Sequence, residues 1–154
     1  MKDPNHTSVI ETLGRNHLVA QLIEDGVHAA VPMWDQGVDL IAYYGGSEGL
    51  VARPLQLKVA ENTRWGVYQK YADIHGLLMT YIWNVRKPAD LEIYAMSYAE
   101  ALNHLTNTGP YTQSKSWREQ GGYDMAPSRN SKMWDSLQPF RMTDGMWRER
   151  LARP

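Results

Sequence analysis

Apolar positions near the start of the chain recur every three to four residues, which is the spacing of one helix face. The residues that follow this spacing are Ile10, Leu13, Leu18, Leu22 and Ile23. Ser8 and Glu11 match a capping box, and Gly26 stands where a helix C-terminus favours glycine. The pattern predicts a helix over residues 8–25, preceded by a polar, disordered lead-in over residues 1–7.

Three extended segments come next, over residues 28–34, 38–44 and 50–60. Residues 35–37 and 45–49 separate them, and both separators contain the glycine and polar residues that form turns. Short turns join antiparallel neighbours, so an antiparallel meander is predicted.

The rest of the chain predicts elements of both kinds. They are a helix over 64–75, a buried strand over 77–85, a strand over 91–95 and a helix that starts at the capping box of Ser97 and reaches 105. From residue 107 the pattern loosens, with one short helix predicted over 132–137. This order predicts an α/β fold with helices around a central mixed sheet. We expect one domain, with a core over residues 8–106 and an irregular C-terminal extension over residues 107–154.

Charge and composition narrow the class of protein only partly. The net charge is −1, but residues 111–154 carry eight Lys/Arg against five Asp/Glu, so this region is +3 and the remainder −4. A basic region suits phosphate contacts, and a solvated mixed surface explains it equally well. There is no cysteine, which excludes disulfides and zinc-thiolate sites. No signal peptide and no membrane-spanning stretch is evident, so a cytoplasmic protein without membrane contact is expected.

The candidate chemistry lies on the second and third extended segments. Alternate residues of a strand face the same way, so Gln56 and Lys58 share one face while Leu55, Leu57 and Val59 point into a core. Asp39 on the neighbouring segment completes a carboxylate, an amide and an amine. Such a set suits a hard divalent cation beside a phosphodiester.

Simpler explanations exist for each of these residues. Gln56 and Lys58 also fit a solvated strand face, and Asp39 also fits a cap on the turn after Gly37. Asp35 is interpreted as turn chemistry.

A helix, a three-strand meander, a helix and a strand, with Asp39 before Gln56-Leu57-Lys58, resemble the PD-(D/E)xK nuclease superfamily. The resemblance covers roughly residues 8–95 and implies a restriction-endonuclease-like αβββαβ core, similar to the small Holliday-junction resolvases.

The resemblance also implies metal-dependent hydrolysis of DNA. Asp39, the amide of Gln56 and the backbone carbonyl of Leu57 would hold Mg²⁺ or Mn²⁺, and Lys58 would orient the attacking water and stabilise the phosphoryl oxygens. Members often add a glutamate from the first helix, for which Glu11 is the candidate.

Two features depart from the family pattern. An amide stands at position 56, where a carboxylate is usual, so the site has less charge for a cation. Glu11 is explained better by its capping box than by metal binding, and His17 better as a helix-face residue than as a ligand.

Three functions follow from these residues. The first is a metal-dependent DNA nuclease, and the second is a nuclease-fold protein with a degraded site that binds nucleic acid or a protein partner without cleavage. The third is an interaction protein whose Trp- and Tyr-rich tail mediates oligomerisation, and the aromatic residues also permit a homodimer.

Overall fold

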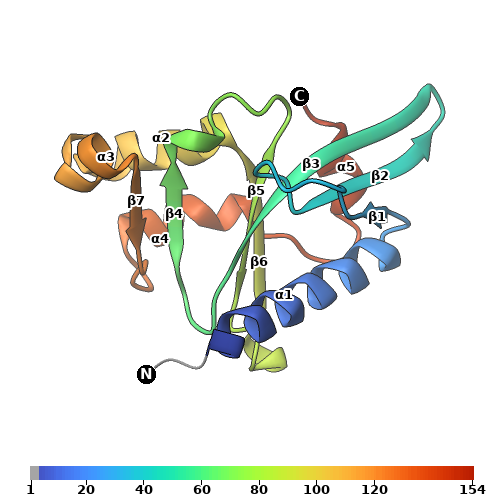
Figure 1. Ribbon diagram of the computed structural model, residues 1–154, viewed down its shortest axis with the longest axis horizontal. Helices are drawn as coiled ribbons and strands as arrows, with labels where there is room; N and C mark the ends of the chain where they lie inside the picture. Colours follow the sequence, from blue (N-terminus) through green and yellow to red (C-terminus); the bar gives the residue numbers. More distant parts are fainter. Residues whose placement is uncertain (1–3) are drawn as a thin grey trace.

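The computed structural model describes residues 4–154, with side chains from His6 onward, and its centre is a five-stranded mixed sheet of order β1-β2-β3-β5-β6 (Figure 1). The strands are β1 (His28–Ala30), β2 (Leu40–Gly46), β3 (Gly49–Val59), β5 (Leu78–Trp83) and β6 (Glu92–Ser97). β1, β2 and β3 pair antiparallel, which confirms the predicted meander. β3 and β5 are parallel neighbours, and β5 and β6 are antiparallel. The α/β class and the mixed sheet are confirmed.

The first helix, α1 (Pro4–Glu24), is longer than predicted. It starts at a proline, which the first turn of a helix tolerates because the missing N–H has no partner there. Residues 4–7 are therefore helical rather than disordered, and residues 1–3 lie outside the described part. The capping box at Ser8 is wrong, because Ser8 lies inside the helix and its carbonyl accepts a hydrogen bond from Thr12.

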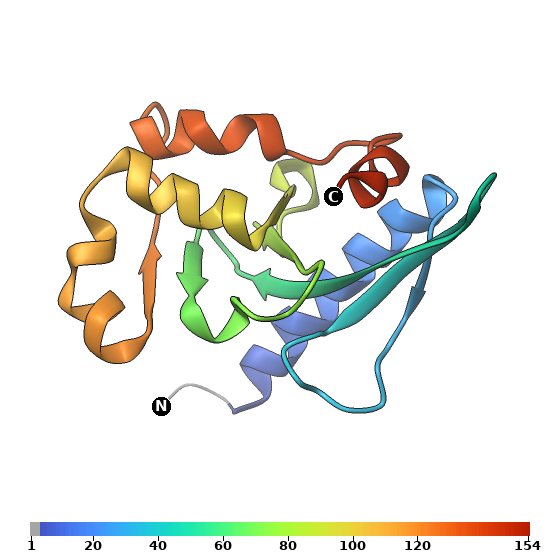
Figure 2. The same cartoon turned by 90° about the horizontal axis from the view of Figure 1, so that it is seen from above.

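Two hydrophobic cores occupy the two faces of the sheet. α1 and α5 (Trp147–Ala152) cover one face, where Leu18 and Trp147 are fully buried. α2 (Tyr98–Thr108) and α4 (Lys132–Leu137) cover the other face with β4, as the view from above shows (Figure 2). The fully buried β5 lies between both cores, as its uninterrupted apolar sequence predicted. α2 begins with the predicted capping box of Ser97 and Glu100.

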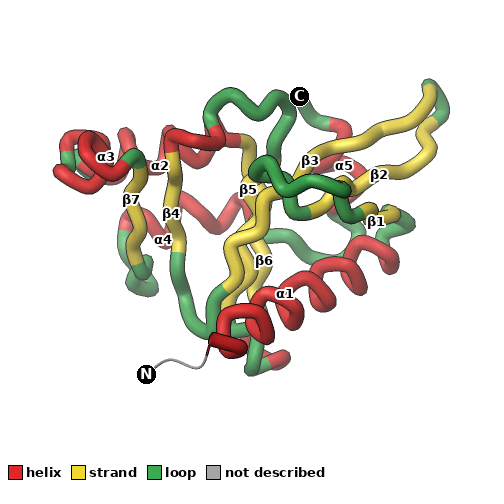
Figure 3. The backbone as a smooth tube through the Cα atoms, viewed as in Figure 1, coloured by secondary structure: helices red, strands yellow, loops and turns green. Residues whose placement is uncertain are grey.

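The helix predicted over residues 64–75 does not form. This segment is β4 (Trp65–Tyr68) followed by the short 3-10 helix η1 (Gln69–Tyr71), and β4 pairs with β7 (Gly122–Met125) in a separate two-stranded sheet (Figure 3). Three consecutive residues, Trp65 to Val67, are buried, whereas an isolated surface helix would turn one of them to solvent. Gly66 allows β7 to approach closely, because a Cβ at this position would overlap the Asp124 side chain.

The C-terminal extension is ordered, not irregular. Besides α4, which has the predicted bounds, it contains α3 (Lys115–Gln120), β7 and α5. Its apolar residues are part of both cores, with Trp147 and Leu151 in one and Met133 and Leu137 in the other. The segments are too short to show helical or strand periodicity, so long-range burial decides their structure. None of the helices in the described chain combines the length and the apolar character that crossing a membrane requires.

Candidate functional site

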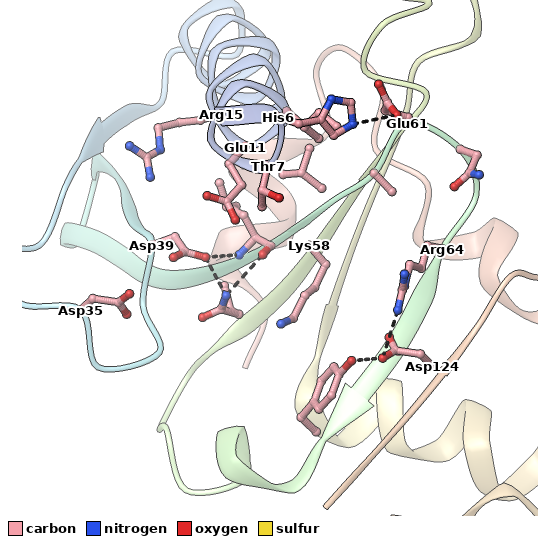
Figure 4. A pocket seen from close by; sticks show the side chains of 18 residues that line it. His6, Thr7, Glu11, Arg15, Asp35, Asp39, Lys58, Glu61, Arg64 and Asp124 are labelled. Carbon is pink, nitrogen blue, oxygen red and sulfur yellow. Dashed lines mark hydrogen bonds and ion pairs between the residues drawn. The ribbon is translucent and has the colours of Figure 1, made fainter. Parts of the chain in front are cut away.

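Asp39 precedes β2 and is bound firmly to β3 (Figure 4). Its N–H donates to the carbonyl of Leu55 at 2.9 Å, and its Oδ2 accepts hydrogen bonds from the Leu57 N–H and from Gln56 Nε2, each at 2.7 Å. The carboxylate therefore faces β3 and does not cap the turn after Gly37. That turn is closed by Asp35, whose Oδ1 accepts a hydrogen bond from the Gly37 N–H at 3.1 Å, as predicted.

Gln56 and Lys58 lie on one face of β3, opposite to Leu55, which is buried in the α1 core. The Gln56 side chain is only 7% exposed, so a solvated strand face does not describe it. Its amide nitrogen donates to Asp39 and also, at 3.3 Å, to the Leu57 carbonyl. The amide N–H group thus occupies the two oxygens that the predicted metal site requires. An ion would bind there only after the amide turned its oxygen inward.

The ammonium group of Lys58 lies between two aromatic rings. Its Nζ donates to the Tyr71 hydroxyl at 3.1 Å and lies 4.8 and 4.9 Å from the ring centroids of Tyr68 and Tyr71. Tyr68 in turn donates to Asp124 of β7, which also pairs with Arg64 at 3.7 Å. Cation–π contacts and the hydroxyl restrict the flexible lysine to one position.

Glu11 and Arg15 extend from adjacent turns of α1 into the same cleft (Figure 4). Because α1 begins at Pro4, Glu11 does not cap the helix and its carboxylate is available to the site. Arg15 has a buried Nε without a hydrogen-bond partner in the described residues. His17 faces elsewhere, within 3.3 Å of the Val85 carbonyl, consistent with a helix-face residue.

The cleft is large and polar. It encloses about 780 Å³ between α1, β3 and β4, and a second hollow of about 230 Å³ continues from it toward η1. Asp35, Asp39 and Gln56 line both, so these residues lie at the junction. A volume of this order holds a nucleotide-sized ligand.

Burial raises the pKa of Asp39 above its ordinary value, and the hydrogen bond from the Leu57 N–H opposes this change. Asp35 raises the same pKa further, whereas the charges of Lys58 and Arg15 lower it. The half-buried carboxylate is therefore stabilised poorly as an anion, and an added cation would stabilise it.

The donor set fits one weakly held hard cation better than a high-affinity metal. Among residues 4–154, no group of three or more His, Cys, Asp and Glu side chains is arranged to hold an ion. Asp39, the Leu57 carbonyl and the Gln56 amide are adjacent, and Asp39 Oδ1 has no hydrogen-bond partner in the described chain. Mg²⁺ commonly binds through one or two carboxylates and retains several waters, which is compatible with this set.

The sequence did not identify Arg15, Tyr68, Tyr71 and Asp124 as residues of the site. Arg15 follows Glu11 by four residues, which places both on one helix face, so this signal was present. No local signal marks the two tyrosines, because their place depends on β4 replacing the predicted helix. Gln69, in the same segment, donates to the Trp117 carbonyl at 2.9 Å and faces α3.

Comparison of the chain with protein-family models, with curated protein sequences and with solved structures gave no match.

Proposed function

We propose that this protein is a divalent-cation-dependent nuclease that hydrolyses phosphodiester bonds of DNA. The observation that carries the proposal is the convergence of Asp39, Gln56 and the Leu57 carbonyl in one polar cleft, beside a Lys58 that is held by hydrogen bonding and ring contacts. These are the residues that the PD-(D/E)xK resemblance indicated.

The chemistry would be divided between the residues. Asp39, the Leu57 carbonyl and a reoriented Gln56 amide would hold Mg²⁺ or Mn²⁺, with Glu11 supplying a second carboxylate. The ion would neutralise charge that develops on the phosphate. Lys58 would hold the attacking water or a phosphoryl oxygen through its N–H groups, and Arg15 would bind a neighbouring phosphate.

The charge balance of the cleft supports a role for a bound cation. Glu61 pairs with His6 and Arg86, and Arg64 pairs with Asp124. Apart from these paired residues, the two hollows contain three carboxylates and three cations. These six are Glu11, Asp35, Asp39, Arg15, Lys58 and Lys70. Their charges sum to zero, and one bound divalent ion makes the cleft +2, which favours a polyanion.

One observation favours a second candidate, in which the site binds nucleic acid without cleaving it. The Gln56 amide N–H already satisfies the oxygens of Asp39 and Leu57 that an ion would use. A fixed amide in that position would replace the cation and leave Lys58 and Arg15 as phosphate contacts only. Gln56→Glu distinguishes the two candidates. In a cation site the additional carboxylate strengthens Mn²⁺ binding, whereas in a metal-free site it only repels Asp39 and destabilises the fold.

The central experiment measures cleavage of plasmid and oligonucleotide DNA with Mg²⁺ or Mn²⁺. Lys58→Met keeps an unbranched side chain as far as the Cε position and removes the ammonium group, so cleavage should fall to background. Lys87→Met is the matched control, because Lys87 lies in an exposed turn and lines neither hollow. Equal cleavage by the parent, Lys58→Met and Lys87→Met would indicate a contaminating nuclease and remove the catalytic proposal. DNA binding without cleavage by the parent would support the second candidate.

A further inference from the structure

The loop between β1 and β2, residues 31–39, exposes large apolar side chains in its first half, and Asp35 to Gly37, which follow directly, line the two hollows. Val31, Met33 and Trp34 are 65%, 89% and 72% exposed. Other tryptophans, such as Trp65 and Trp147, are completely buried. Neighbouring exposed apolar residues on a single loop are characteristic of a contact surface, because exposure of a Trp to water is unfavourable.

The base of this loop is held in place by specific contacts. Asp35 and Gly37 form the turn described above, and Gly37 adopts a φ of +84°. A Cβ at Gly37 would lie 2.9 Å from the Ile74 side chain and 3.2 Å from the Tyr71 ring, so the backbone packs directly against η1 and the segment after it. Asp39 then pairs with β3. The exposure of Met33 and Trp34 therefore results from the path of an anchored loop, which projects beyond the sheet in Figure 2.

The position of the loop specifies what would contact it. Trp34 adjoins Asp35, which lines both hollows at the place where they meet. Arg15, which lines the larger hollow, and Lys70, which lines the smaller one, have no carboxylate partner in the described chain. A polyanionic strand that follows these cations past Asp39 would present the bases next to the loop. The cations would contact the phosphates of such a strand, and the exposed apolar side chains would contact its bases. The two surfaces therefore match the two chemical parts of a nucleotide.

We propose that the β1–β2 loop binds an unpaired nucleotide next to the phosphodiester in the cleft, with Trp34 stacked on the base and Met33 packed beside it. The inference rests on the proposed function and specifies its substrate class. In an uninterrupted duplex each base face is covered by its neighbours, so a Trp side chain has no face to stack on. The preferred substrate is therefore nucleic acid with a single-stranded segment.

The test is a binding measurement with fluorescein-labelled DNA, in which Ca²⁺ replaces Mg²⁺ as the cation. A single-stranded oligonucleotide and a blunt duplex of the same sequence are compared by fluorescence anisotropy. Trp34→Ala should weaken binding of the single strand roughly 5- to 100-fold, the range of one aromatic–base stack, and change duplex binding little. Trp34→Phe should retain most of the affinity because it keeps an aromatic ring.

Leu50→Ala is the matched control. Leu50 is 71% exposed, similar to Trp34, but it lies at the start of β3, and unlike Trp34 it has no chain neighbour that lines either hollow. The affinity of the Leu50→Ala variant for both DNAs should equal that of the parent. Equal loss in Leu50→Ala and Trp34→Ala would show a nonspecific effect of apolar surface and overturn the inference.

The outcomes separate this inference from the proposed function. If the parent cleaves or binds DNA and Trp34→Ala does so equally well, only the role of the loop is wrong. If the parent neither binds nor cleaves any DNA, both proposals fail. Sedimentation velocity of the parent and of Trp34→Ala tests a second copy as the occupant of the loop. A dimer that Trp34→Ala dissociates, with unchanged affinity for the single strand, would assign the loop to self-association and overturn the inference.

Discussion

The two walls of the cleft meet at Lys58 but differ in composition and origin. The acidic wall consists of Glu11 of α1 with Asp39 and Gln56, whereas the aromatic wall consists of Tyr68 and Tyr71 with support from Asp124. In the proposed function the first wall supplies oxygen ligands, whereas the second restricts the position of the Lys58 ammonium group. This division indicates that changes on the acidic wall should affect cation binding, and changes on the aromatic wall only the placement of Lys58.

The largest effect is expected at Asp39. Asp39→Asn keeps an oxygen that can accept from the Leu57 N–H but removes the charge that would bind the ion. Mutation of a residue that only hydrogen-bonds to a metal ligand lowers metal affinity roughly 10- to 100-fold. Removal of the charge of a ligand itself should therefore weaken Mn²⁺ binding at least about 100-fold. Calorimetric titration with Mn²⁺ measures this. Asp90→Asn is the control, because Asp90 is exposed in the short 3-10 helix over Pro88–Asp90, and this variant should bind Mn²⁺ as the parent does. Unchanged affinity in Asp39→Asn would show that the acidic wall holds no ion.

A change beneath the acidic wall should affect stability instead. Gly14 faces β3 so closely that a Cβ would overlap the Val59 side chain. Gly14→Ala should therefore lower the free energy of unfolding by about 1–3 kcal/mol, the usual effect of overpacking. Urea denaturation measures the change. Gly45→Ala is the control, because a Cβ at Gly45 meets no atom within 4 Å, and equal stability of the two variants would contradict the close approach of α1.

The aromatic wall should give a smaller effect on the rate. Tyr71→Phe keeps the ring beneath Lys58 and removes only the hydroxyl that accepts its hydrogen bond. We expect kcat to fall roughly fivefold with an unchanged KM, since one hydrogen bond contributes about 1 kcal/mol. Mn²⁺ affinity should not change. An effect on Mn²⁺ binding as large as that of Asp39→Asn would show that the two walls do not act separately.

The smallest effect concerns the pH dependence of stability. Because burial raises the pKa of Asp39, the folded protein binds this proton more tightly than the unfolded chain. The stability contributed by this group is therefore complete below the ordinary pKa and is lost as the pH rises through the higher folded pKa. Asp39→Asn should melt at a slightly higher temperature than the parent at pH 7, and the difference should disappear toward about pH 4. Thermal melts at both pH values test the sign, and a difference that grows on acidification would contradict it.

The sequence predicted the acidic wall more completely than the aromatic wall. Strand alternation placed Gln56 and Lys58 on one face, and a two-stranded hairpin made Asp39 their neighbour. The pairing of Leu40 with Leu55 sets the register that brings the Asp39 carboxylate to the Leu57 N–H. The capping-box motif of Ser8 and Glu11 wrongly predicted a helix start, because α1 already begins about one turn earlier, at Pro4.

The aromatic wall could not be inferred from its own segment. Trp65 and Tyr68 are three residues apart, which is compatible with a helix face, and only β7, more than fifty residues later, provides the partner that makes this segment a strand. The same reason applies to the extension, whose short elements are stabilised by burial of Trp134 and Trp147 rather than by local preference.

By itself, the sequence determined the mixed sheet, the antiparallel meander and the face of β3 that carries Gln56 and Lys58, because alternation and turn chemistry act between near neighbours. Only the tertiary structure decided that Glu11 is available to the cleft, that two tyrosines enclose Lys58 and that Trp34 remains exposed beside Asp35. Those features arise from contacts between distant segments, whose free energy depends on burial that no local pattern records.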